Sequence, residues 1–181
     1  MNSGWSFRGV REEDIPRLAE LEQRCFSDQW SEASLRSGAQ TPGNIRVLET
    51  AGKILGYTVT RRILDEAELL RIGVDPAQRG KGLGKALLED FLQEEAAVSA
   101  VIDRLAGELP DGLPYRSASL TVYLDVRVGN APAIALYERA GFETVARMKE
   151  YYRCPAEDGF RMVKTLDAQA IAGLAGPGQP E

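Results

Sequence analysis

The sequence predicts an α/β protein in which helices pack on both faces of a mixed sheet of about seven strands. Short apolar segments with strand character alternate with segments of helical periodicity along the chain. Strand candidates at 67–74 and 120–126 are separated by one long helix candidate, so we expect parallel strands joined by a right-handed crossover. The length of 181 residues, with 44% hydrophobic and 27% charged residues, suits one soluble domain.

The first third of the chain predicts one strand, two helices and a hairpin. Residues 5–10 read as a short strand, and 11–26 as an amphipathic helix with apolar residues at helical spacing, namely Ile15, Leu18, Leu21 and Cys25. Ser31 suits the N-cap of a second short helix. After a turn at 41–44 we expect two strands, 45–49 and 54–61, around Ala51-Gly52-Lys53.

The middle of the chain predicts a strand, a long helix, a loop and a second strand. The strand at 67–74 ends at Asp75-Pro76. A helix begins at Leu83, with Leu87 and Phe91 following at four-residue spacing, and we expect it to run on through Leu105. Two prolines and a glycine predict a loop over 108–117, and the alternating, β-branched segment 120–126 predicts a strand.

The last third predicts a helix and two more strands. Asn130 suits a helix N-cap, Pro132 suits the first turn, and Gly141 suits the C-terminal stop. We expect the final strands at 142–147 and 160–164, around a polar loop. The domain is therefore expected to span 1–166, and residues 167–181, which end in Gly-Pro-Gly-Gln-Pro-Glu, are expected to be a disordered tail.

A glycine-rich segment between the strand at 67–74 and the following helix is the most informative motif. It reads Arg79-Gly80-Lys81-Gly82-Leu83-Gly84-Lys85. Glycines let the backbone turn tightly and approach a ligand, and a helix start presents free N–H groups and positive dipole character. Strand, glycine turn and helix start together predict a phosphate cradle.

The spacing excludes two common phosphate loops. A Walker loop needs Gly where this chain has Arg79 and Ser or Thr where it has Ala86. The dinucleotide fingerprint needs a third Gly where the chain has Lys85. What remains, Arg79-x-x-Gly82-x-Gly84, resembles the acetyl-CoA signature of the GCN5-related N-acetyltransferases, in which this segment holds a pyrophosphate.

A second motif supports the resemblance. Residues 123–142 read YLDVRVGNAPAIALYERAGF, which is similar to the superfamily's strand ending in V-R-x-x-N and helix closing with L-Y-x-x-x-G-F. The resemblance covers roughly 6–166 and implies the superfamily's fold, in which the two central parallel strands splay apart. Within the superfamily the chain most resembles the bacterial ribosomal-protein alanine N-acetyltransferases, through LDEAELL at 64–70, DQWSE at 28–32 and KEYY at 149–152.

The resemblance implies a cofactor site and two catalytic groups. Asp125 stands where the family has a general-base Glu, and Tyr137 matches its proton-donating Tyr. The backbone of Ile72, Gly73 and Val74 is expected to pair with the pantetheine arm. The pyrophosphate is expected on N–H groups from Arg79, Gly80, Lys81, Gly82, Leu83 and Gly84, with Asn130 also holding the coenzyme.

Other residues remain open in role. Glu68 is the alternative base and a candidate acceptor-binding residue, and Tyr151 and Tyr152 are candidates for gripping a peptide. Without the resemblance, Tyr137 could equally be a core residue and Asn130 only a helix cap. Asp125 is one methylene shorter than Glu, so it reaches about 1.5 Å less far, and it is expected to take the proton either directly or through a bridging water. The segment 98–117 is also longer than in the family.

Composition narrows the chemistry and the partners. The chain has no histidine, which excludes Ser-His-Asp and Cys-His catalysis and removes the commonest zinc ligand, so we expect no metal. The net charge of −5 disfavours direct nucleic-acid binding. No apolar run is long enough to span a membrane, and no secretion signal is evident, so we expect a cytoplasmic protein with Cys25 and Cys154 as free thiols.

The amine chemistry favours an α-amino acceptor. Its reference pKa of about 7.7–8.0 compares with about 10.4 for lysine, so deprotonating lysine costs roughly 3–4 kcal/mol more. The sequence therefore predicts an acetyl-CoA-dependent enzyme that acetylates the N-terminal amine, expected to be alanine, of a ribosomal protein. A small amine or a lysine side chain is the alternative acceptor, and a non-catalytic acyl-CoA sensor is a third reading.

Overall fold

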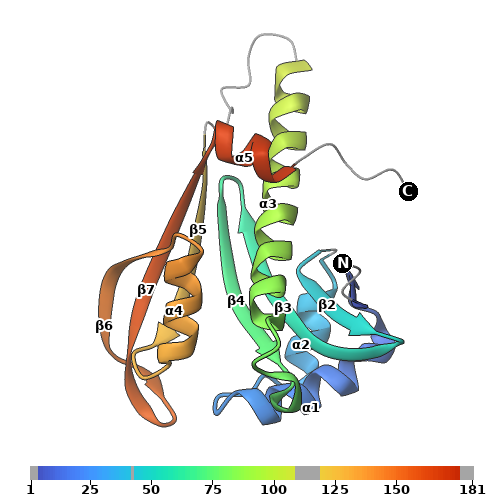
Figure 1. Ribbon diagram of the computed structural model, residues 1–181, viewed down its shortest axis with the longest axis vertical. Coiled ribbons are helices and arrows are strands. Elements are labelled where there is room, and N and C mark those ends of the chain that lie inside the picture. The colour runs from blue at the N-terminus through green and yellow to red at the C-terminus, as the bar shows by residue number, and fades with distance from the viewer. Residues whose placement is uncertain (1–3, 42, 109–118, 176–181) are drawn as a thin grey trace.

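A seven-stranded sheet with the order β1-β2-β3-β4-β5-β7-β6 forms the centre of the protein (Figure 1). The computed structural model describes residues 4–41, 43–108 and 119–175. The strands are β1 (Ser6–Gly9), β2 (Ile45–Thr50), β3 (Lys53–Ile63), β4 (Glu66–Val74), β5 (Ser119–Arg127), β6 (Glu143–Arg153) and β7 (Ala156–Asp167). The helices are α1 (Ile15–Cys25), α2 (Glu32–Ala39), α3 (Leu83–Glu108), α4 (Ala131–Arg139) and α5 (Ala168–Ala175), with 3-10 turns η1 (Glu12–Asp14) and η2 (Pro76–Gln78).

The predicted α/β architecture is confirmed. Only β4 and β5 pair in parallel, among the strands described, and α3 connects them. Helices α3 and α4 lie on one face of the sheet, α1 and α2 on the other, and α5 crosses α3 (Figure 1). Apolar residues of α3 pack against β4 and β5 in one core cluster, and those of α1 and α2 pack against β2 and β3 in another.

The two parallel strands separate toward their carboxyl ends. They pair only from Glu66 with Thr121 to Leu69 with Leu124, although β4 continues to Val74 and β5 to Arg127. Beyond Leu69 the edge of β4 that faces β5 therefore has no strand partner, whereas its other edge pairs with β3 as far as Val74. This is the predicted splay between the central parallel strands, and it opens the sheet at the carboxyl ends where ligands of α/β proteins bind.

A bulge in β4 stands at the start of the splay. Leu69 pairs with Thr60 and Arg71 with Val59, so Leu70 is an extra residue with no partner on β3. A bulge adds local twist and re-aims the side chains that follow it. It accordingly turns the last residues of β4 away from β5, and this local change in direction accompanies the opening.

Three expectations need correction or fall outside the description. Most of the polar loop expected between the last two strands belongs to the strands themselves, because β6 runs to Arg153 and β7 begins at Ala156. Of the tail expected to be disordered, Asp167 ends β7 and the next residues form α5, whose Ile171 is 3% exposed against the α3 side of the core, while residues 176–181 lie outside the described residues. Of the loop expected over 108–117, residue 108 ends α3 and the rest lies outside the described residues.

The free thiols predicted at Cys25 and Cys154 are confirmed. Within the ranges given above, no helix combines the length and the apolar character needed to cross a membrane.

Candidate active site

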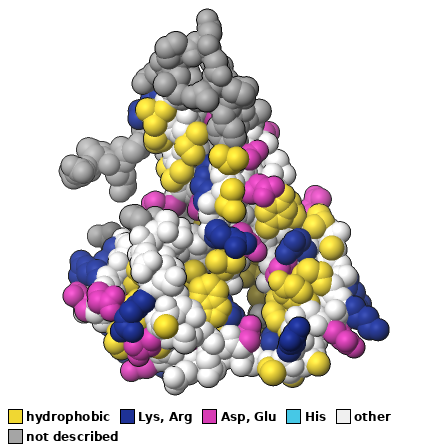
Figure 2. Space-filling model, turned by 180° about the vertical axis from the view of Figure 1, so that it is seen from behind, with side chains coloured by type: hydrophobic (Ala, Val, Ile, Leu, Met, Phe, Trp, Pro, Cys, Tyr) yellow, Lys and Arg dark blue, Asp and Glu magenta, His cyan; other side chains and the backbone are white. Residues whose placement is uncertain are grey.

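A cavity of about 770 Å³ occupies the splay between β4 and β5. Its walls come from both strands, the segment between α1 and α2, the start of α4 and the end of the β6–β7 hairpin. Seen from the face opposite α3, the lower half of the molecule is hollowed between two lobes (Figure 2). Five segments far apart in sequence thus meet around one opening.

The cavity brings together most of the predicted chemical side chains. Both predicted catalytic residues, Asp125 and Tyr137, line it. The predicted acceptor residues Glu68, Tyr151 and Tyr152 line it as well. Of the predicted cofactor residues, Ile72 and Asn130 are in the lining, while Gly73, Val74 and the glycine loop at 79–84 are not.

Asp125 lies on β5, and both oxygens of its carboxylate accept hydrogen bonds from neighbouring side chains. Arg161 of β7 donates to Oδ1 from Nε and to Oδ2 from Nη2, both at 2.9 Å, and the Tyr151 hydroxyl donates to Oδ2 at 2.7 Å. Burial alone would raise the pKa of Asp125, but these hydrogen bonds and the positive charge of Arg161 hold the pKa below its ordinary value. The carboxylate is therefore ionised at neutral pH.

Glu68 is the other carboxylate in the cavity. Its position opposite Tyr123 in the parallel ladder places it one pair before the strands separate. Arg61 of β3 binds Oε2 at 2.5 Å, and the side chain is 26% exposed. Among the described residues Oε1 accepts no side-chain hydrogen bond, so Glu68 keeps one oxygen free to accept a proton.

Asn130 caps the start of α4, and Tyr137 lies near the end of that helix. Tyr137 is 5% exposed, packs edge-on against Phe142 and belongs to the core cluster while also reaching the cavity. Burial raises the pKa of Tyr137 well above its ordinary value, so its hydroxyl stays protonated. Asn130 is the predicted N-cap, since its Oδ1 accepts from the Ala133 N–H at 3.3 Å. The two readings of each residue, structural and functional, are therefore compatible.

The end of the β6–β7 hairpin forms one lip of the cavity. Tyr151 and Tyr152 contact each other edge-on, with ring centroids 5.1 Å apart. Tyr151 is bonded to Asp125, and the guanidinium of Arg127 stacks on the Tyr152 ring at 4.2 Å. Arg127 also donates to the Ser27 hydroxyl at 3.1 Å, and so it links this lip to the segment after α1.

The segment between α1 and α2 forms the facing lip. The guanidinium of Arg71, on β4 just after the bulge, stacks on Phe26 at 4.5 Å and lies 5.4 Å from the Trp30 ring centroid. It also contacts Asp28 at 3.3 Å. Buried Glu22 accepts from the Trp30 N–H at 2.8 Å. Two lips rich in aromatic residues thus flank the carboxylates.

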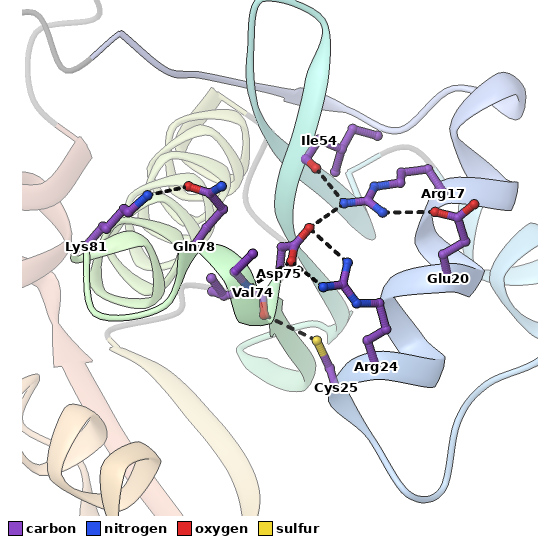
Figure 3. Close-up of polar contacts among 10 residues, drawn as sticks. Arg17, Glu20, Arg24, Cys25, Ile54, Val74, Asp75, Gln78 and Lys81 are labelled. Atoms are coloured by element: carbon purple, nitrogen blue, oxygen red, sulfur yellow. Dashed lines mark hydrogen bonds and ion pairs between the residues drawn. The ribbon is translucent and has the colours of Figure 1, made fainter.

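The glycine loop lies beyond the carboxyl end of β4 and leads into α3 (Figure 3). Gly80 and Gly82 have φ values of +76° and +81°, in the left-handed region that favours glycine. No atom lies within 4 Å of a Cβ built on either residue, so the face of the loop is open. The Gly82 carbonyl accepts from the Ala86 N–H at 3.0 Å, which leaves the N–H groups of the first turn without helical partners.

The loop is anchored to α1 through Asp75 (Figure 3). The Asp75 side chain is 6% exposed and contacts Arg17 at 2.6 Å and Arg24 at 3.0 Å, and it also caps η2 by accepting from the Ala77 N–H at 3.0 Å. Burial opposes ionisation of Asp75, but these donors lower its pKa below the ordinary value. The Lys81 ammonium turns back to Gln78 at 2.8 Å, which keeps its charge beside the loop.

Sequence reasoning missed three residues that support the walls of the cavity and the glycine loop. Arg161, Arg71 and Asp75 carry no local motif, because their partners lie 36, 43 and 58 positions away. Arg127 stands in the V-R-x-x-N stretch, and that pattern was the one available signal. Within the described ranges no group of three or more Asp, Glu or Cys residues is arranged to hold a metal ion.

Comparisons with known proteins agree with this arrangement. The model of the acetyltransferase (GNAT) domain matches residues 41–144. The chain is 35% identical over 146 residues to the [ribosomal protein bS18]-alanine N-acetyltransferase of Escherichia coli K12, covering 81% of this chain and 84% of that protein. It is 33% identical over 156 residues to the N-alpha-acetyltransferase RimI of Mycobacterium tuberculosis, covering 82% and 85%. The crystal structure of the ribosomal-protein-S18-alanine N-acetyltransferase from Escherichia coli is similar with a TM-score of 0.73 and 30% identity, over 90% of this chain and 94% of that one.

Proposed function

Because the chain belongs to the GNAT acetyltransferase family and is an N-acetyltransferase, we propose that it transfers acetyl from acetyl-CoA to a protein N-terminal amine. The observation that carries the proposal is the cavity in the splay, which combines carboxylates and phenols with an open glycine loop at one end. The glycine loop suits the pyrophosphate of a thioester coenzyme, and the carboxylates suit the removal of a proton from an amine acceptor.

The glycine loop binds the pyrophosphate of the coenzyme in this proposal. The Arg79 N–H already donates to the Pro76 carbonyl at 3.4 Å, so the N–H groups from Gly80 to Gly84 are the ones that offer hydrogen bonds, and the start of α3 adds positive dipole character. Lys81 and Arg79 add charge. The free edge of β4 at Ile72, Gly73 and Val74 runs from the loop into the cavity, so it can pair with the pantetheine arm and polarise the thioester carbonyl.

Asp125 accepts the proton of the incoming ammonium through Tyr151. The phenol can bridge the short aspartate and the amine, because its hydroxyl already donates to Asp125 Oδ2 at 2.7 Å. As the amine or an intervening water gives a proton to the Tyr151 oxygen, the phenol passes its own proton to Asp125, and solvent then removes it. The lowered pKa of Asp125 keeps the acceptor ionised, although it also makes the carboxylate a weaker base.

Glu68 is the alternative proton acceptor. Its Oε1 is free of side-chain hydrogen bonds in the described part of the chain, and it lines the same cavity. Because Glu68 would act without Tyr151, the two routes differ in their dependence on that hydroxyl.

Tyr137 protonates the departing thiolate in this proposal. The raised pKa keeps the phenol protonated, and a hydrogen bond from it stabilises negative charge that develops on sulfur. Asn130 lines the same cavity at the start of α4, and among the described residues its amide nitrogen makes no hydrogen bond while its oxygen caps the helix, so the nitrogen can hold the coenzyme.

The acceptor class follows from the amine chemistry and from the relatives. An α-amine is neutral at neutral pH at roughly 3–4 kcal/mol lower cost than lysine, which suits weak carboxylate bases. The E. coli relative is named for the alanine of ribosomal protein bS18. We therefore assign an N-terminal alanine of a ribosomal protein as the acceptor, with action in the cytoplasm and without direct contact to nucleic acid or membrane.

Acceptor profiling tests the proposal. Labelled acetyl-CoA is incubated with the enzyme and peptides that begin with alanine, and with the same peptides blocked at the N-terminus but carrying lysine. Label on the free N-terminal peptides alone is the expected result. Transfer to the blocked lysine peptides, or to polyamines only, would replace the proposed acceptor by a side-chain or small-molecule amine.

A further inference from the structure

Two adjacent tyrosines on β6 face the same cavity, which an ordinary strand does not allow. Successive side chains of a strand point to opposite faces of the sheet. Tyr151 and Tyr152 nevertheless both line the cavity, and they reach different residues of β5, namely Asp125 and Arg127. Something in the hairpin must break the alternation.

The break is a wide bulge in β6. Met148 pairs with Gly159 and Tyr152 pairs with Glu157, so residues 149–151 stand opposite Asp158 alone. Inside the bulge Glu150 has φ +51°, in the left-handed region that a residue with a Cβ occupies at a cost. The unusual backbone at Glu150 directly precedes the tyrosine pair and turns Tyr151 to the cavity side.

Asp158 holds the bulge from the opposite strand. Its Oδ1 accepts from the Glu150 N–H at 2.9 Å, and its Oδ2 accepts from Arg147 Nε at 2.8 Å. The hydrogen bonds lower the pKa of Asp158, so the carboxylate is ionised at neutral pH. A charged acceptor on the N–H of a left-handed residue is a specific support for that backbone.

Gly159 provides the space into which the rings fold. A Cβ at Gly159 would lie 3.1 Å from Tyr151 Cδ1, 3.2 Å from Tyr152 Cε2 and 3.3 Å from Met148 Cε. Gly159 pairs with Arg127 in the β5–β7 ladder, so the rings cross β7 at this glycine to reach β5. The support under Glu150 and the space over Gly159 thus serve the same two rings.

We propose that Asp158 is a positioning residue of the acceptor site, which fixes the left-handed turn at Glu150 and thereby sets both tyrosine rings against the acceptor. Asp158 itself touches neither substrate. The inference deepens the proposed function and rests on it, because the tyrosines matter only if an acceptor binds between the two lips.

The first test is D158A, assayed with an alanine-initiated peptide and acetyl-CoA. Without the acceptor for the Glu150 N–H, the cost of the left-handed residue is no longer offset, and we expect kcat/KM for the peptide to fall about fivefold to tenfold. The KM for acetyl-CoA should stay unchanged, since the donor loop lies elsewhere. R147Q, which removes only the other partner of Asp158, is the matched control and should stay within about twofold of wild type.

The decisive test is rescue by E150G in the D158A background. Glycine occupies φ near +51° without a Cβ penalty, so it should restore most of the lost kcat/KM if Asp158 acts through that turn. A general structural defect would not be repaired by an exposed glycine. G159A gives an independent approach, because its Cβ displaces the same rings, and it should reduce peptide kcat/KM with no change in the KM for acetyl-CoA.

Each result has one meaning. The positioning role would be overturned if kcat/KM of D158A for the peptide stayed within twofold of wild type, or if the KM for acetyl-CoA rose by as much as kcat/KM for the peptide fell. It would also be overturned if E150G did not restore the lost kcat/KM. If wild type ignores alanine peptides and acetylates another amine, the proposed acceptor fails instead. The D158A and E150G comparison is then run with that amine, where the same loss and rescue are expected.

Discussion

The proposed donor site beside the cavity offers backbone groups from one short segment, whereas the proposed acceptor side of the cavity offers side chains gathered from several strands. On the donor side, residues 80–84 offer N–H groups next to the start of α3, and Asp75 ties the segment to α1. On the acceptor side, Tyr151 depends on Asp125, Arg161 and Asp158, which lie on β5 and β7.

The two sides should therefore differ in how strongly substitutions at distant residues affect them. A backbone site depends on the φ angles of a few residues, and substitutions elsewhere reach it only through its anchor. A side-chain site depends on rings and carboxylates held by long-range hydrogen bonds, so distant residues can change acceptor use while leaving coenzyme binding intact. The following four predictions, from the largest effect to the smallest, test this separation.

Removing the Tyr137 hydroxyl should give the largest loss. In Y137F we expect kcat to fall roughly 100-fold, the size of a general-acid contribution, because the thiolate then leaves unprotonated. The dissociation constant of acetyl-CoA, measured by calorimetry, should hardly change. Y123F is the control, since the Tyr123 hydroxyl makes only a 3.5 Å contact with Glu66 outside this cavity. An unchanged kcat would remove Tyr137 from the acid role.

A strained phosphate loop should weaken the donor side alone. Gly82 has φ +81°, so we expect G82V to raise the dissociation constant of acetyl-CoA about tenfold through the cost of a left-handed valine. Gly52, in the β2–β3 turn at φ +75° with equally open surroundings, is the matched control. If G52V weakens coenzyme binding as much as G82V does, the loop is not the phosphate site.

The pH dependence should identify the base. If ionised Asp125 accepts the proton, activity is lost as pH falls through its pKa, which Arg161 holds low. In R161Q burial is opposed only by Tyr151, so the pKa of Asp125 rises and the acidic limb of kcat/KM should move to higher pH. The profile is measured from about pH 3 to pH 9, so that the limb of a carboxylate lies inside the window. R61Q is the companion variant, and a changed kcat/KM there with an unchanged profile in R161Q would assign the base to Glu68.

Loosening the anchor of the loop should affect stability more than turnover. D75N leaves Arg17 and Arg24 without their carboxylate, and we expect a loss of about 1–2 kcal/mol in unfolding free energy at pH 7, since both arginines remain partly exposed. Because the folded pKa of Asp75 is lowered, this contribution is present above the ordinary carboxyl range and fades as pH falls below it.

Chemical denaturation checks the D75N prediction, with E20Q as the control, because Glu20 is an exposed partner of Arg17. We expect the kcat of D75N to stay within about threefold of the wild-type value. A large loss of kcat with normal stability would show that Asp75 acts in the reaction rather than as an anchor.

The sequence was informative where structure is set locally. The glycine loop, the Ser31 and Asn130 caps, the Gly141 stop and the strand-helix-strand order all follow from neighbouring residues, and the structure has each of them. Asp125, Tyr137 and the tyrosine pair were found through the family resemblance rather than from spacing.

What the sequence did not indicate depends on distant partners. The sequence predicts strands at 142–147 and 160–164 but a loop over the end of the β6–β7 hairpin between them, because β6 is an exposed edge strand whose register shifts twice, which erases the alternation that marks a strand. Helix α5 is not predicted because it is short and made mostly of small residues, and Ile171 is buried only by tertiary packing. Arg161 and Asp158 act across strands, so no short pattern contains them.

Hydrogen exchange measured first with coenzyme A and then with an added alanine-initiated peptide tests the central claim most directly. We expect the coenzyme to slow exchange at 70–74 and 79–85 and to leave 148–153 unchanged, and the peptide then to slow exchange at 148–153. Coenzyme A that binds without slowing exchange at 79–85 would contradict the account.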